Sequence, residues 1–136
     1  MVRSLVRIIG TGAAALAAVN VVWALLFHTT SPAGFVGLLY GVVAYRAGHA
    51  APQWAARVGG VAWLVLSAVD GVSRWALAPM LGPSDRPMLA PVGNSLLVAA
   101  LALVALAMVS GGFVGSIGGN VARGAGSRSA PAPDAP

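Results

Sequence analysis

Four long apolar stretches, separated by short polar segments, set the pattern of this chain. The clearest of them, Ile8 to Phe27, contains no charged residue and is about long enough to cross ~30 Å of hydrocarbon as a helix. Backbone groups in lipid need hydrogen-bond partners within their own segment, so each stretch is predicted to be helical. We therefore predict an all-α fold, an integral membrane four-helix bundle with spans at about residues 8–27, 33–50, 58–78 and 89–109.

The four spans form one predicted transmembrane domain, residues 1–115. Residues 116–136 are rich in Ala, Gly, Ser and Pro and contain few of the large apolar residues that build a core, so they are predicted to be a disordered tail. Gly111, Gly115 and Gly119 repeat every fourth position at this boundary, and this spacing would also allow the last helix to extend.

Two of the spans have an alternative interpretation. The second span has only Ala33 to Tyr45 before Arg46 interrupts it, and a re-entrant hairpin would fit that length as well. The first span follows a basic start and contains Ala15-Leu16-Ala17, the small-residue pattern of a signal-peptide cleavage site. The apolar run continues beyond that site to Phe27, which favours a transmembrane span that stays in the mature protein over a signal peptide that is cleaved off.

The composition indicates a membrane protein and excludes several kinds of chemistry. Hydrophobic residues make up 58% and charged residues 8%, whereas a soluble domain has roughly 25% charged residues. The chain has no Cys and no Lys, which excludes disulfides, thiolate metal sites, thiol nucleophiles and Schiff-base lysines. Its Ala, Gly, Val and Arg bias is typical of a GC-rich bacterial genome.

The positive charges are all arginines, and they flank the apolar segments. This pattern is typical of orientation signals and argues against binding of nucleic acid. With four spans, the side with most arginines holds Arg3, Arg7, Arg46, Arg57, Arg123 and Arg128, and the other side holds Arg74 and Arg86. We therefore predict a multi-pass protein of the cell membrane with both termini in the cytoplasm.

The third span contains an acidic and a basic residue one helical turn apart, Asp70 and Arg74. At about 100° per residue they project onto the same face as Gly60, Ser67 and Gly71, opposite a face of valines. Small residues allow close helix packing, so this face is predicted to point into the bundle. The polar residues at similar depth make up a candidate intramembrane polar site: Asp70, Arg74, Asn20, Ser67, Tyr40 and Asn94.

This site has two interpretations. Ionisable residues within a membrane are functional candidates, so Asp70 would be a proton or cation site with Asn20 as a polar ligand. Alternatively, Asp70 and Arg74 form an internal ion pair that stabilises the fold. Arg74 cannot give up its proton and would hold Asp70 ionised, which favours the structural interpretation.

Glycines at spacings of three and four line one stripe of the second span and include Gly37-x-x-x-Gly41. Such stripes let another backbone approach closely, within the bundle or in a neighbouring subunit. The glycines predicted to serve helix packing are Gly34, Gly37, Gly41, Gly48, Gly60 and Gly71.

No catalytic constellation, metal site or cofactor site emerges from the sequence. His28 and His49 lie at opposite ends of their spans, ~30 Å apart, and cannot share one haem or metal. The serines lack a plausible His and acidic partner. We predict a non-enzymatic accessory or assembly subunit whose partners are the lipid bilayer and either a second copy or a larger membrane complex. The alternative is a small proton- or cation-coupled transporter that uses Asp70.

Overall fold

The computed structural model describes residues 1–82 and 94–129, which form four α-helices and two short 3-10 helices. The α-helices are α1 (Val2–Phe27), α2 (Ala33–Ala50), α3 (Ala55–Ala76) and α4 (Asn94–Ser129). This part of the chain contains no β-strand, so the predicted all-helical class is confirmed. Within it, three helical segments are long and apolar enough to cross a membrane: Val2–Phe27, Pro52–Ala76 and Ala99–Arg128. These segments indicate a membrane protein.

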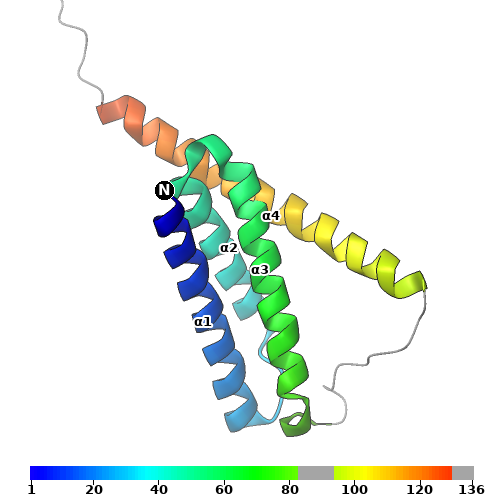
Figure 1. Ribbon diagram of the computed structural model, residues 1–136. Helices are drawn as coiled ribbons and strands as arrows, with labels where there is room; N and C mark the ends of the chain where they lie inside the picture. Colours follow the sequence, from blue (N-terminus) through cyan, green and yellow to red (C-terminus); the bar gives the residue numbers. More distant parts are fainter. Residues whose placement is uncertain (83–93, 130–136) are drawn as a thin grey trace, which may run out of the picture.

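Each of the first three helices ends at a local break. α1 ends at His28, whose left-handed conformation (φ 53°) lets its N–H bond the carbonyl of Ala24. α2 ends before Pro52, which opens the 3-10 helix η1 (Pro52–Trp54). α3 is followed by the 3-10 helix η2 (Ala78–Met80), which contains Pro79. The resulting turns are short and place α1, α2 and α3 side by side in alternating directions (Figure 1).

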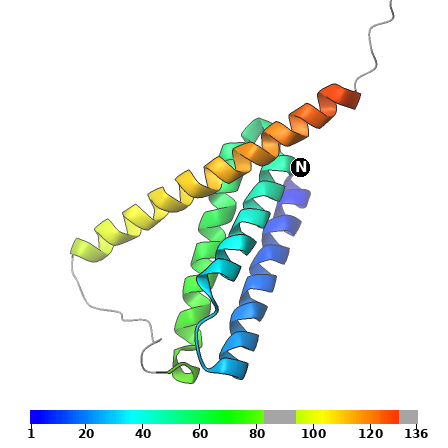
Figure 2. The same ribbon diagram turned by 180° about the vertical axis from the view of Figure 1, so that it is seen from behind.

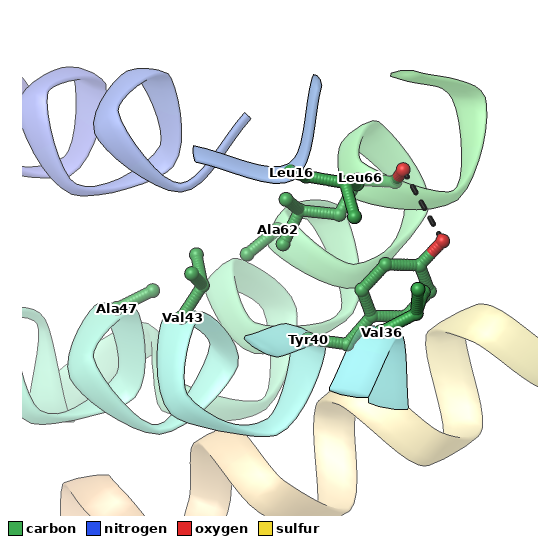
Figure 3. Packing of buried hydrophobic residues seen from close by; sticks show 7 residues of the cluster. All are labelled: Leu16, Val36, Tyr40, Val43, Ala47, Ala62 and Leu66. Carbon is green, nitrogen blue, oxygen red and sulfur yellow. Dashed lines mark hydrogen bonds between the residues drawn. The ribbon is translucent and has the colours of Figure 1, made fainter. Parts of the chain in front are cut away.

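The hydrophobic core lies between these three helices. Figure 3 shows its side chains converging from α1, α2 and α3, with the Tyr40 ring beside Leu66. Leu16 and Leu66 are the largest side chains that are completely buried. The buried core residues are Leu16, Val36, Tyr40, Val43, Ala47, Ala62 and Leu66.

Helix α4 crosses the outside of this three-helix unit obliquely instead of running alongside it. Figures 1 and 2 show its C-terminal half over the end that holds the N-terminus and the α2–α3 turn, and its first half pointing away from the bundle. The fourth helix of the predicted bundle is therefore present, but only part of its length packs against α2 and α3.

Glycines explain why α4 crosses at this point. A methyl group on Gly59 would overlap the carbonyl oxygen of Gly111 and come within 2.7 Å of the Cα of Gly115. A methyl group on Gly48 would likewise overlap the backbone of Gly115. The backbones of α2, α3 and α4 thus touch directly, because none of these positions has a side chain to hold them apart.

The glycines predicted to serve packing divide into two groups. Gly48 and Gly60 lie against α4, where a methyl on Gly60 would come 2.9 Å from Met108 Cε. The remaining four have no neighbour within 4 Å in the described part of the chain: Gly34, Gly37, Gly41 and Gly71. The close contacts use instead Gly59, Gly111 and Gly115, together with Gly118 and Gly119 further along α4.

The predicted disordered tail from residue 116 is corrected by the structure, in which α4 continues to Ser129. Packing is the physical reason as far as Gly119: a Cβ on Gly118 would overlap the carbonyl of Tyr45, and one on Gly119 would overlap Ala55. These contacts hold the helix against the ends of α2 and η1 although its composition is poor in core-forming residues. Beyond Gly119 the helix continues with mostly exposed residues. Residues 130–136, and residues 83–93 with the start of the predicted fourth span, lie outside the described residues.

Candidate polar site

Polar side chains from three places in the chain meet between α1 and α3. Asn20 lies on the buried side of α1 and is 3% exposed, and its Nδ2 donates a hydrogen bond of 2.8 Å to Asp70 Oδ1 on α3. Ser31, in the turn between α1 and α2, is 4% exposed, and its hydroxyl donates a 2.5 Å hydrogen bond to Asn20 Oδ1. The small residues around Asn20 on α1 allow this close approach.

Arg74 completes the cluster from the next turn of α3. Its Nε donates to Asp70 Oδ2 at 2.9 Å, the ion pair that the four-residue spacing makes possible. Its Nη2 lies 3.4 Å from both the hydroxyl and the carbonyl oxygen of Ser31. Asn20, Ser31, Asp70 and Arg74 therefore form a closed ring of hydrogen bonds, which we call the polar ring.

The polar ring is neutral overall and its hydrogen bonds are internally satisfied. Both carboxylate oxygens of Asp70 accept a hydrogen bond, one from an amide and one from a guanidinium. Among the described residues, no buried side-chain nitrogen or oxygen lacks a partner. Such a ring ties α1, α3 and the α1–α2 turn together and leaves no unpaired charge between the helices.

A small cavity lies beside the polar ring. It has a volume of about 10 Å³ and is lined by Asn20, Ser31 and Arg74 together with Thr29, Thr30 and Leu81. This volume is at the lower limit of the space that one water molecule needs, and the polar walls offer hydrogen-bond partners. The cavity therefore has room for a water or a proton carrier of that size, and no room for an organic substrate.

Ser31 is the member of the ring that the sequence analysis missed. Ser31 lies between the first two predicted spans, residues 8–27 and 33–50, so its side chain was not assigned to the site. The turn also packs against the end of α3: the Gly82 N–H donates to the His28 carbonyl at 3.0 Å. A signal was present in the sequence, because so short a turn must fold back beside the last two turns of α1, and Asn20 lies at the start of those turns.

Two other predicted site residues lie next to the ring without joining it. The Tyr40 hydroxyl donates to the Leu66 carbonyl at 3.3 Å (Figure 3), and its ring stands edge-on to Trp63 at 5.3 Å. The Ser67 hydroxyl donates to the Trp63 carbonyl one turn earlier in α3, at 2.8 Å. Both side chains therefore satisfy backbone carbonyls of α3.

The remaining candidates are placed elsewhere. Asn94 is the first residue of α4, at the end of that helix that points away from the bundle, and its side chain lies outside what the structure describes. His28 caps α1, and His49 lies in the last turn of α2 with its ring 6.3 Å from that of Tyr45. Within residues 1–82 and 94–129, no group of three His, Asp or Glu side chains is arranged to hold a metal ion.

Comparison with protein-family models, curated proteins and solved structures finds no match to this chain.

Proposed function

We propose that this protein is a non-enzymatic accessory or assembly subunit of a larger membrane complex. The observation that supports this proposal is the first half of α4, where every residue from Ala99 to Leu106 is exposed. The exposed fractions are 61% for Leu101, 67% for Leu103 and 63% for Leu106. A helix that leaves its own bundle in this way presents all of its sides to a neighbour.

The composition of this half-helix fits a helical partner. Leucines alternate with alanines, and Ala99, Ala102 and Ala105 give the close approach that helix pairs in membranes require. The described residues of this region carry no charge, so the expected partner surface is the apolar transmembrane helix of a larger membrane protein. The glycine contacts with α2 and α3 anchor the other half of α4 and leave this half available.

The polar ring supports a structural role for Asp70 within such a subunit. Its charges neutralise each other, and the adjacent cavity admits about one water. We further propose that all four helices cross the membrane, with the arginine-rich end in the cytoplasm. This end contains the start of α1, the end of α2, the start of α3 and the last part of α4, which together carry six arginines.

Substitution of one alanine tests the proposed contact. Ala105→Leu enlarges an exposed position of α4 and is expected to lower the amount of partner that co-purifies in mild detergent at least several-fold. The matched control is Ala15→Leu, an exposed position of α1, which should leave the partner yield and the melting temperature unchanged.

The partner should also form a discrete cross-link to a photoreactive group at position 103 and none to one at position 22. Isolation of the native protein as a monomer in mild detergent would contradict the proposal.

A second candidate function is a small proton- or cation-coupled transporter, favoured by the cavity beside the polar ring. This function requires Asp70 to release Arg74 during transport and to bind the transported proton or cation in its place. Asp70→Asn should then abolish proton or solute flux into liposomes while the protein remains folded. Flux that is absent in the native protein, or unchanged in Asp70→Asn, would exclude this mechanism.

A further inference from the structure

We propose that a pocket at the arginine-rich end of the bundle binds the phosphate group of an anionic phospholipid. The pocket lies between the start of α3 and the last part of α4 and has a volume of about 330 Å³. Its polar walls are Gln53, Arg57, Ser116 and Arg123, so two cations and two neutral hydrogen-bonding groups face one space. Below we call it the headgroup pocket.

The two arginines of the headgroup pocket are not neutralised by acidic groups. The Arg57 guanidinium lies 4.9 Å from the centre of the Trp54 ring, a cation–π contact that keeps its charge. Arg123 Nη2 donates to Asn120 Oδ1 at 2.6 Å, also a neutral partner. In the part of the chain that the structure describes, the ion pair between Arg74 and Asp70 is the only one, and no carboxylate lines the pocket. Guanidinium groups in this setting are well suited to phosphate oxygens.

The backbone adds to this positive potential. The first three residues of α3, Ala55 to Arg57, form part of the pocket wall. No side chain caps this end of α3, and no acidic residue lies in its first turn. The positive end of the helix dipole therefore lies at the wall of the pocket that the two arginines also line.

An apolar groove beside the pocket identifies the ligand as a lipid. This groove has a volume of about 250 Å³ and is lined by Leu5, Ile9, Val58 and Val61 on α1 and α3, together with Trp54 and Arg57. The last two residues also line the headgroup pocket, so the polar and apolar spaces adjoin. An acyl chain in the groove and a phosphate in the pocket is the arrangement expected of a phospholipid at a membrane surface.

The test measures binding of phosphatidylglycerol, phosphatidylcholine and inorganic phosphate to the delipidated full-length protein by native mass spectrometry. We expect phosphatidylglycerol to bind most tightly, because its headgroup has no cation to repel the arginines. The double variant Arg57→Gln/Arg123→Gln should bind it about tenfold more weakly or worse. The matched control, Arg3→Gln/Arg128→Gln, removes the same charge from exposed positions outside the pocket and should bind within about twofold of the native protein.

Several outcomes would overturn the proposal. Equal weakening in the pocket variant and the control would show that only net charge matters, and equal binding of the two lipids would show that the pocket does not select an anion. Inorganic phosphate that binds as tightly as phosphatidylglycerol would overturn the lipid assignment. Arg123→Gln alone, on the exposed side of α4, should lower the affinity without lowering the melting temperature, which separates loss of the ligand contact from loss of the fold.

Discussion

Gly115→Ala is expected to lower the free energy of unfolding by about 2–3 kcal/mol and to detach α4 from the rest of the protein. The added methyl group would overlap the carbonyl oxygen of Ala55 and come 2.8 Å from the Cα of Gly59. Both are backbone atoms of α3, so no side chain can rotate away to make room. The two helices must separate, and they then lose the close packing along their whole contact.

A disulfide measures this separation directly, because the chain has no native cysteine. A Cβ on Gly112 would lie 4.0 Å from the Cβ of Ala56, within the range of a disulfide. Ala56→Cys/Gly112→Cys should therefore cross-link α3 to α4 rapidly, and Gly115→Ala in that background should slow the reaction. The matched control is Gly124→Ala on the same helix, where no atom lies within 4 Å of the new methyl. It should leave cross-linking unchanged and raise helix stability by up to about 1 kcal/mol. Equal effects of the two substitutions would show that the glycine crossing does not hold α4 in place.

Arg74→Gln is expected to destabilise the protein by about 3 kcal/mol, more than the simultaneous removal of both charges. The single substitution leaves Asp70 ionised in an apolar segment, with only Asn20 to donate to it. The side chains are 26% and 16% exposed, so the penalty is smaller than for a fully buried pair. In Asp70→Asn/Arg74→Gln the Asn at position 70 still accepts the hydrogen bond of Asn20, and no charge remains.

The measurement is a double-mutant cycle of unfolding in detergent, with Arg3→Gln as the control for loss of one exposed arginine. We expect Arg74→Gln to unfold at a lower temperature than the double variant, and Arg3→Gln to unfold with the native protein. If Arg74→Gln is as stable as the native protein, the polar ring does not stabilise the fold. Transport activity of Asp70 would then become the better explanation of the cluster.

The end of α1 and both ends of α2 and α3 lie within three residues of the predicted bounds, because uncharged runs and prolines mark them. In contrast, α1 begins at Val2 instead of residue 8, and α4 continues to Ser129 instead of ending at residue 109. Helix projection also placed Asp70 and Arg74 on the side of α3 that meets α1, where the structure pairs Asp70 with Asn20. Ser31 was not accessible in this way, since projection within a helix says nothing of how a turn folds back over its end. The stripe of Gly34, Gly37 and Gly41 shows a related limit: a small-residue face permits close packing but does not identify a partner.

The course of α4 was the least predictable part of the fold. Its glycines from 111 to 119 repeat every fourth residue, but their partners lie in α2, η1 and α3, far away in the sequence. Composition alone predicted a tail beyond residue 115, because Gly, Ala and Ser side chains contribute little apolar area to a core. At the crossing, direct contact between helix backbones holds α4 in place instead, and this contact cannot be recognised before the helices are packed together.

The glycine crossing also constrains how this protein can vary. In most cores a larger side chain at one position can be accommodated by a smaller one opposite, so that pairs of positions change together. At Gly59, Gly111 and Gly115 the opposing atoms are mainly peptide groups, and no substitution makes a peptide group smaller. Related chains that retain this crossing should therefore keep glycine at all three positions, whereas paired changes should be found in the side-chain core around Leu16 and Leu66.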